Sequence, residues 1–349
     1  MESFRLSLCV FSLCLLNVRT FVGGIGDNDT LILTLTINLL LLLAIDYSHY
    51  LKKFLFVGLL FPIMIYNREI LALLDIFLCV YLFRKFPIKT LAFINLSLLL
   101  IGFLFLTLLR ELDILTINQE IWYLTGKGAA RTYGFNNPNT FGGFIFSLIV
   151  NAYIIFISFK RNSLLVLFLL WIAIISYNYC LSRMMLIGSI VLILVHFMVK
   201  WRIFKKWMRY CVAFLPVLFF LVNFYLIANL SDFKDIDVLT SGRLGIYAGV
   251  LGMMTKLNWL IGVQLPDGPM DGSLWMLFFT GGITGLLFFF VKFYFSVTRC
   301  FKELYIYFPV ILAVLVSGFV ENTFSSVGGV SIIFWLLVCR FYTQKSYNL

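Results

Sequence analysis

The sequence has few charged residues. Only 12% of its 349 residues are charged, whereas 62% are hydrophobic, and the mean hydropathy is +1.01. Soluble domains carry about 25% charged residues and about 45–50% apolar ones. A soluble core cannot hold this much apolar surface, but a bilayer can. The composition therefore excludes an ordinary soluble protein and predicts an all-α integral membrane protein.

The chain also lacks CxxC cysteine pairs, internal repeats at a fixed period and room for a sizeable soluble domain. Its seven cysteines are scattered through apolar runs and none forms a CxxC pair, so we interpret them as small apolar residues in helices. The first 21 residues resemble a signal peptide but lack a small-x-small cleavage site, which favours a retained first helix. We expect one polytopic membrane domain over residues 1–349.

Apolar runs of nearly the length of a membrane span, about 20 residues, recur along the whole chain. They predict about twelve transmembrane helices, at residues 4–21, 30–45, 54–66, 70–83, 90–109, 139–159, 163–181, 184–199, 210–230, 273–298, 303–320 and 327–341.

The charges indicate the orientation of these spans. With the N-terminus inside, 18 of the 27 basic residues but only 3 of the 16 acidic residues fall on the inner side. This asymmetry follows the positive-inside rule and predicts that both termini are inside. It also explains the net charge of +11 without nucleic acid as a partner. Two long loops, 110–138 and 231–272, are then outside, and we expect short amphipathic helices in them.

Three arginines on the predicted outer side are not explained by this rule: Arg131, Arg183 and Arg243. One interpretation is snorkelling, in which the side-chain stem lies in lipid and the guanidinium reaches water. The other is anion binding, because guanidinium presents a rigid fork of donors to phosphate oxygens. Three such residues in polar or glycine-rich contexts on one face favour a shared phosphate site.

The segment ARTYGFNNPNTFGGF, residues 130–144, supports such a site. Pro138 disfavours helical geometry before it, and Asn139 or Thr140 is expected to cap the helix that follows. A helix N-terminus suits phosphate, so Asn137 and Asn139 join the candidate phosphate ligands. Three glycines allow a ligand or a neighbouring helix to approach closely, namely Gly134, Gly142 and Gly143.

In the second outer loop we predict a helix over about 243–257, capped by Thr240 or Ser241, with Arg243 in its first turn. Its apolar stripe indicates either a helix lying on the outer membrane surface or ordinary packing against other helices. The stripe consists of Ile246, Tyr247, Val250, Leu251, Met254 and Leu257.

Three segments in this order resemble the O-antigen polymerase and O-antigen ligase superfamily of bacterial membrane glycosyltransferases. They are RTYGFNNPNTFGG, LSRMMLIG and the stretch from SGRLGIYAGVL to DGSLWMLFFTGGITGLLFFF, and together they cover about residues 125–290. The N-terminal third is similar only in being helical and apolar.

The resemblance implies a metal-independent enzyme of the bacterial inner membrane with an outward-facing active site and no cofactor. It implies that donor and acceptor are oligosaccharide repeats on undecaprenyl pyrophosphate, made for O-antigen, capsule or exopolysaccharide. A flippase and a chain-length regulator are implied as further partners. Arg131 and Arg243 would stabilise the pyrophosphate leaving group, with Arg183 as a third partner or a structural anchor.

One departure from the family concerns the ligases, which carry a His-Asn pair where this chain has Asp271-Gly272. The only histidines here, His49 and His196, fall near the inner side. The departure favours a polymerase over a ligase. A lipid-linked oligosaccharide flippase is a further alternative, although we find no pseudo-symmetry between the halves of the chain.

A base for the attacking hydroxyl is expected among the carboxylates. Asp271 is the first candidate and Glu321 the second, although each is also explained as a solvated loop or cap residue. Asp75 lies within a span, where buried acids are costly and often functional. Asp235 and Asp237 have the spacing of a DxD metal motif, but nucleotide sugars stay inside the cell, so no metal is expected there.

Overall fold

The computed structural model describes most of the chain as helices. The described residues are 2–25, 31–44, 70–84, 86–112, 120–123, 128–133, 135, 137–159, 162–203, 207–240, 242–265, 271–299, 304–325 and 328–345. Fourteen α-helices lie in this part of the chain. They are α1 (Glu2–Ile25), α2 (Leu31–Leu43), α4 (Ile70–Phe83), α5 (Ile88–Glu111), α6 (Pro138–Phe156), α7 (Asn162–Cys180), α8 (Arg183–Lys200), α9 (Met208–Ala228), α10 (Lys234–Leu239), α11 (Arg243–Met253), α12 (Lys256–Ile261), α13 (Ser273–Arg299), α15 (Phe308–Val320) and α16 (Gly329–Lys345), with a 3₁₀ turn η2 (Tyr305–Tyr307) before α15.

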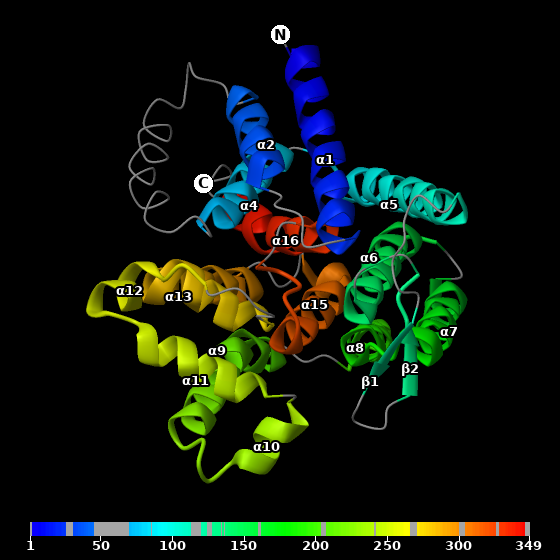
Figure 1. Cartoon of the computed structure of the whole chain (residues 1–349). Coiled ribbons are helices and arrows are strands. Elements are labelled where there is room, and N and C mark those ends of the chain that lie inside the picture. Colours follow the sequence, from blue (N-terminus) through cyan, green and yellow to red (C-terminus); the bar gives the residue numbers. More distant parts are fainter. Residues whose placement is uncertain are drawn as a thin grey trace.

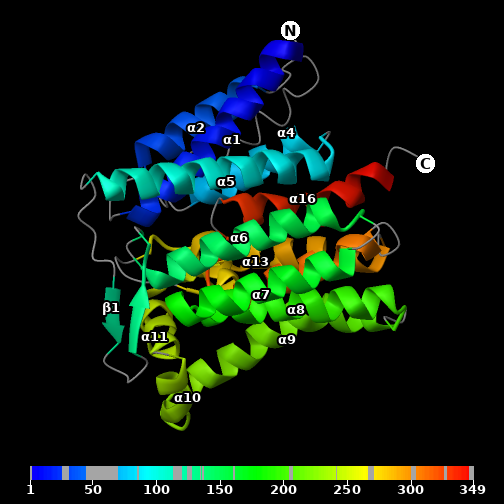
Figure 2. The same ribbon diagram turned by 90° about the vertical axis from the view of Figure 1, so that its right-hand side faces the viewer.

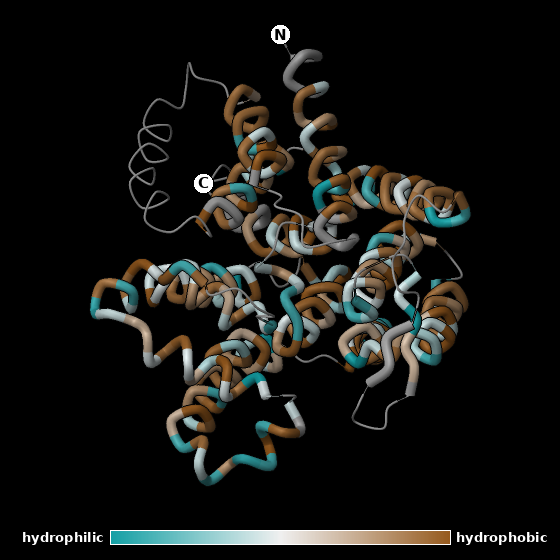
Figure 3. The backbone as a smooth tube through the Cα atoms, in the orientation of Figure 1, coloured by the Kyte–Doolittle hydropathy of each residue, from teal (hydrophilic) through white to brown (hydrophobic). Residues whose placement is uncertain are grey.

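Six helices are long and apolar enough to cross a membrane: α5, α6, α7, α8, α9 and α13. The described part also contains five shorter apolar helical segments. Each predicted span other than 54–66 coincides with a helix, and 54–66 lies outside the described residues. The six long helices mark the chain as a multi-pass membrane protein, and Figure 3 shows apolar residues along most of the bundle.

Two shorter helices form the centre of the bundle. α15 buries every residue from Phe308 to Leu315, and α16 buries every residue from Val330 to Val338. A helix that is apolar all round must be covered on all sides. Figure 1 shows α15 and α16 in the middle, with α4, α5, α6, α8 and α13 around them.

The helices place the two loop regions at one end of the bundle. In Figure 2, helices α5 to α8 lie side by side, with α10 and α11 at the left-hand end. The first turn of α1 and the last turn of α16 lie away from that end. We call the end with α10 and α11 the loop end.

The first loop contains a two-stranded antiparallel sheet in place of the expected amphipathic helix. β1 (Glu120–Tyr123) pairs with β2 (Gly128–Arg131), with Glu120 opposite Arg131. The prediction of helices was therefore wrong for the described part of this loop. Ile121, Trp122 and Tyr123 are β-branched or aromatic residues, which favour strands.

The second loop contains helices, but their boundaries differ from the prediction. The expected helix over 243–257 is divided into α11 and α12, because Thr255 begins a new helix in a capping box with Asn258. Gly242, with a left-handed φ of 78°, precedes α11 as its N-cap, whereas Thr240 ends α10. The predicted cap at Thr240 was therefore wrong, and Ser241 lies outside the described residues.

The apolar stripe of this region is only partly covered. Tyr247 and Val250 are buried, whereas Ile246 and Leu257 are exposed. Leu244, which we did not include in the stripe, is buried as well. α11 packs against α9, so the interpretation as ordinary helix packing fits its buried face.

Glycines allow two close crossings at the loop-end half of the bundle. A Cβ on Gly142 of α6 would lie 2.2 Å from the Ser182 Cβ, so this glycine lets α6 approach the start of α8, as predicted. Gly282 has a φ of 62° and bends α13. A Cβ there would lie 2.4 Å from the carbonyl carbon of Leu260, so the bend is the place where α12 docks on α13.

Candidate functional site

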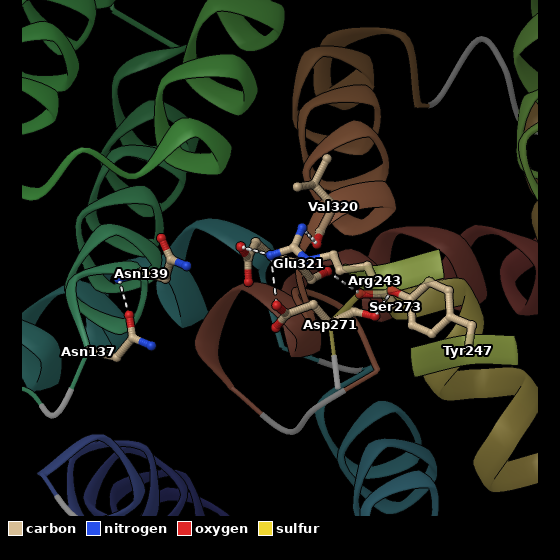
Figure 4. A network of polar contacts seen from close by, with 8 residues as sticks. All are labelled: Asn137, Asn139, Arg243, Tyr247, Asp271, Ser273, Val320 and Glu321. Atoms are coloured by element: carbon tan, nitrogen blue, oxygen red, sulfur yellow. Dashed lines mark hydrogen bonds and ion pairs between the residues drawn. The ribbon is translucent and has the colours of Figure 1, made fainter. Parts of the chain in front are cut away.

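Arg243, Asp271 and Glu321 form one cluster, although 78 residues separate the first from the last. Arg243 opens α11, and its Nη2 donates to Asp271 Oδ2 at 2.7 Å and to Glu321 Oε1 at 2.8 Å. Its Nη1 donates to the carbonyl oxygen of Val320 at 2.6 Å. Figure 4 shows the guanidinium between the two carboxylates and the end of α15. The structure thus brings together one predicted phosphate ligand and both predicted bases.

Two side-chain hydroxyls hold the backbone segments that carry the two carboxylates. Ser273, the first residue of α13, is fully buried and donates to the carbonyl oxygen of Glu321 at 3.1 Å. The same hydroxyl accepts from the N–H groups of Thr323 at 2.8 Å and Phe324 at 3.0 Å. Tyr247 donates its hydroxyl to the backbone carbonyl of Asp271. The segment after α15 is therefore tied to the start of α13, and the carboxylates are held at a fixed spacing.

A cavity of about 310 Å³ lies beside the cluster. Asp271 and Glu321 line one side of it, and Asn137 and Asn139 line the other (Figure 4). Its remaining described walls come from α1, α5, α6 and Phe135 before it, α8, the segment after α15 and the turn into α16. Ligand pockets span about 300–1,000 Å³, so this cavity has room for a small polar group such as one sugar unit of a longer glycan.

The start of α6 presents amide side chains to this cavity. Pro138 is the first residue of the helix, and Asn137 is its cap, since the Asn137 side chain accepts from the Asn139 N–H at 2.8 Å. The predicted caps, Asn139 and Thr140, were wrong by two and three residues, because proline is favoured at the first helical position. The N–H groups of Thr140 and Phe141 donate to the Asn137 carbonyl. Phosphate binding by these N–H groups would have to displace such contacts.

Burial makes Glu321 a stronger base than an ordinary carboxylate. Its side chain is 14% exposed, just beyond the end of α15. This burial, with the negative charge of Asp271, raises the pKa of Glu321 from its ordinary value of 4.5 to about 7, although the nearby Arg243 opposes the rise. Glu321 is thus suited to accept a proton near neutral pH. Burial also raises the pKa of Tyr247, which remains a protonated donor.

Arg243 itself stays charged. Burial alone would lower its pKa, but the charges of Glu321 and then Asp271 raise the pKa above its ordinary value. With both carboxylates ionised, the three side chains carry one net negative charge. The contacts of Arg243 therefore favour a role in holding the carboxylates.

Arg131 and Arg183 lie apart from this cluster. Arg131, at the end of β2, is exposed, and its guanidinium carbon is 5.7 Å from the ring centroid of Tyr179. Arg183 is exposed at the start of α8 and makes no ion pair with any residue that the structure describes. Neither is among the described residues that line the cavity.

Three other residues that the sequence analysis named, Asp237, Asp75 and His196, lie outside the Arg243 cluster. Asp237 Oδ1 accepts from the N–H of Gly245 at 3.1 Å, which ties α10 to α11. Asp75 is fully buried in α4 without a hydrogen bond to any described residue. His196 is buried and pairs with the Tyr153 hydroxyl through Nδ1 at 3.0 Å. The described residues contain no cluster of three or more His, Cys, Asp or Glu side chains that could hold a metal ion.

Ser273 and Asn322 were not predicted as site residues, and Tyr247 was predicted only as a member of the apolar stripe, although its hydroxyl contacts the Asp271 carbonyl. Asn322 follows Glu321 directly and lines the cavity. Ser273 follows Asp271-Gly272 at the start of a long apolar run, and this position was the available signal for a helix start. Its three contacts with residues about fifty positions away carried no sequence signal.

Comparison with protein-family models, with curated proteins and with solved structures finds no significant match to this chain.

Proposed function

We propose that the chain is a polymerase of lipid-linked oligosaccharide repeat units. It transfers a growing glycan from undecaprenyl pyrophosphate to the non-reducing end of another lipid-linked repeat at the outer leaflet of a bacterial inner membrane. The observation that supports this most is the loop-end cavity, where two carboxylates face the amides at the start of α6 (Figure 4).

In this proposal the acceptor hydroxyl enters the cavity beside Glu321. The hydroxyl oxygen forms a bond to the anomeric carbon of the donor, and its proton passes to the Glu321 carboxylate. The bond between that carbon and the pyrophosphate oxygen breaks, and the lipid pyrophosphate leaves. The pKa of Glu321 of about 7 suits this proton transfer. Asp271, on the same side of the cavity, orients the hydroxyl.

The pyrophosphate requires cations outside the cavity. Arg243 is engaged with two carboxylates and a carbonyl. We therefore assign the leaving group to Arg131 and Arg183, which are exposed. Arg243 is a positioning residue for Glu321, and it can contact the pyrophosphate only by releasing a carboxylate. Asn137 and Asn139 contact the sugar next to the reacting bond.

We propose about twelve membrane-spanning helices with both termini inside. The distribution of 27 basic residues supports this orientation. The placement of the first turn of α1 and the last turn of α16 away from α10 and α11 agrees with it (Figure 2). The active site would then face outward, where a flippase delivers lipid-linked repeats and a chain-length regulator can act on the product.

Deletion of the chain tests the proposal. Loss of a polymerase leaves surface glycans of a single repeat. Loss of a flippase leaves repeats inside the cell, and loss of a ligase leaves long chains on the carrier lipid. The proposal predicts the first pattern, restored by the wild-type chain. Either other pattern, or an unchanged chain-length distribution, would contradict it.

A further inference from the structure

The cavity has an unusual balance of charge for a site that serves a phosphate-bearing substrate. Two carboxylates line it, whereas no lysine or arginine is among its described lining residues. The nearest guanidinium, that of Arg243, is already paired with both carboxylates. An anionic group placed here meets two carboxylates, and the described lining offers it no cationic side chain, which is unfavourable in a partly buried site.

The uncharged lining groups suit hydroxyls. Three amides face the cavity, from Asn137, Asn139 and Asn322, and each can both donate and accept. Four hydroxyl side chains add to them: Thr140, Ser147, Thr323 and Ser331. A carboxylate is the strongest acceptor available for a hydroxyl donor. This mixture matches a ligand with many hydroxyl groups and no negative charge.

Aromatic rings form the apolar part of the wall. Phe21 of α1 lies 6.0 Å from Phe135 and 5.8 Å from Phe144, measured between ring centroids, and all three line the cavity. The exposed fractions of Phe21, Phe135 and Phe144 in the folded protein are 9%, 1% and 6%. Such rings provide a rigid apolar surface for the C–H groups of a sugar ring.

We propose that this cavity binds a neutral, hydroxyl-rich sugar unit and discriminates against sugars that carry a carboxylate or a phosphate. In terms of the proposed function, on which this substrate class rests, the unit is the terminal sugar of the acceptor. The selectivity itself is a property of the cavity and can be measured without turnover.

The test measures binding to the full-length protein in lipid nanodiscs by saturation-transfer NMR. The probes are methyl glycosides of common neutral hexoses, 6-deoxyhexoses and N-acetylhexosamines. Matched probes are the 6-carboxylate and the neutral 6-carboxamide of each hexoside, together with inorganic pyrophosphate. We expect at least one neutral glycoside to bind, its carboxamide to bind similarly, and its carboxylate to bind about tenfold more weakly or less.

Single substitutions test whether the two carboxylates cause the selectivity. In Asp271→Asn and Glu321→Gln the discrimination against the carboxylate should fall severalfold, while the neutral glycoside still binds. Asp235→Asn is the matched control, because it removes one exposed negative charge from α10 and should leave the discrimination unchanged. Equal or tighter binding of the carboxylate or pyrophosphate by the wild-type protein would overturn the proposal, as would binding of none of the glycosides.

If the protein polymerises repeats but binds charged and neutral glycosides equally well, the proposed selectivity of the cavity is wrong and the polymerase proposal stands. If the protein binds neutral glycosides selectively but its deletion leaves glycan chain lengths unchanged, the selectivity stands and the polymerase proposal is wrong.

Discussion

Glu321 combines three features that ordinarily occur apart: burial, a paired arginine and an open cavity. Burial destabilises the charged carboxylate and raises the pKa of Glu321, whereas Arg243 stabilises the charged form and lowers the pKa. The net result is a pKa of about 7. The hydroxyl of Ser273 fixes the backbone on which this balance depends. At the scale of single residues, chemistry and stability are therefore coupled at one side chain.

The first prediction concerns pH. Polymerisation by the purified protein should rise with pH and level off above about 7, as Glu321 loses its proton. Glu321→Gln should lower the rate by about 10²–10⁴ and remove this rise. The measurement is the rate of linkage formation between pH 5 and 9. A Glu321→Gln protein that keeps the wild-type profile would exclude Glu321 as the base.

The same group should lower stability as pH rises. The pKa of Glu321 is about 7 in the folded protein and 4.5, the ordinary value, in the unfolded chain. Between these two pH values the folded protein keeps the Glu321 proton, whereas the unfolded chain has lost it. Stability from this group is therefore greatest below about pH 4.5 and declines as pH rises to about 7. The difference in melting temperature between the wild type and Glu321→Gln should change in this window and be constant above it.

A further prediction concerns Arg243. Arg243→Met leaves two partly buried carboxylates without a counter-charge, which should destabilise the protein by about 2–4 kcal/mol. Adding Glu321→Gln removes one of these charges and should restore part of the loss, without restoring activity. Melting temperatures of the two single variants and the double variant measure this coupling. If the effects of the two single substitutions on stability are additive, the contact between Arg243 and Glu321 contributes nothing to the stability of the protein.

At the scale of elements, the start of α6 and the bend of α13 shape the site. Pro138 fixes where α6 begins, so the amides of Asn137 and Asn139 face the carboxylates across the cavity. At the bend of α13 the N–H of Val263 donates to the carbonyl of Phe279 at 2.7 Å, and Thr284 donates to the carbonyl of Leu260 at 2.9 Å. α12 and the residues after it are thus attached to α13 by hydrogen bonds to backbone carbonyls.

Gly282→Ala tests this attachment. A Cβ there would lie 2.4 Å from backbone atoms of Leu260, at a φ of 62° and ψ of −164° that only glycine adopts readily. We expect a loss of about 2–3 kcal/mol, seen as a lower melting temperature. Gly249→Ala in α11 is the control, because a Cβ there meets nothing within 4 Å. If the two variants melt alike, the bend does not hold α12.

The positions of the helices could be predicted from the sequence far better than their contacts. Long apolar runs predicted the positions of the six described helices that are long and apolar enough to cross a membrane. The hairpin of β1 and β2 and the break at Thr255 were missed, because short segments depend on local caps and strand pairing more than on hydropathy. Arg243, Asp271 and Glu321 were each singled out, but their meeting depends on the packing of α11, α13 and α15, which no local pattern encodes.

At the scale of the whole molecule, polar and apolar regions are sorted between the loop end and the bundle. Figure 3 shows hydrophilic residues gathered around α10, whereas the central helices are mainly apolar. Exposed apolar side chains on α5, α7 and α9 include Leu104, Trp171 and Leu218. These helices thus present a lipid-compatible surface around the central pair α15 and α16.

Cysteine labelling tests the orientation. In a variant whose seven cysteines are replaced by serine or alanine, Val238→Cys in α10 should react with a membrane-impermeant maleimide in spheroplasts. Trp201→Cys, exposed just after α8, should react only after the membrane is opened. The reverse pattern would place the cavity on the inner side and contradict the proposed site of reaction.

We propose that this chain alone joins lipid-linked repeats. The most direct measurement uses the purified protein in liposomes with undecaprenyl-pyrophosphate-linked repeats from cells that lack the chain, in the presence of a metal chelator. We expect a ladder of lengthening glycans and one released undecaprenyl pyrophosphate for each linkage, and neither with Glu321→Gln. Repeats that remain single with the folded wild-type protein would contradict the claim.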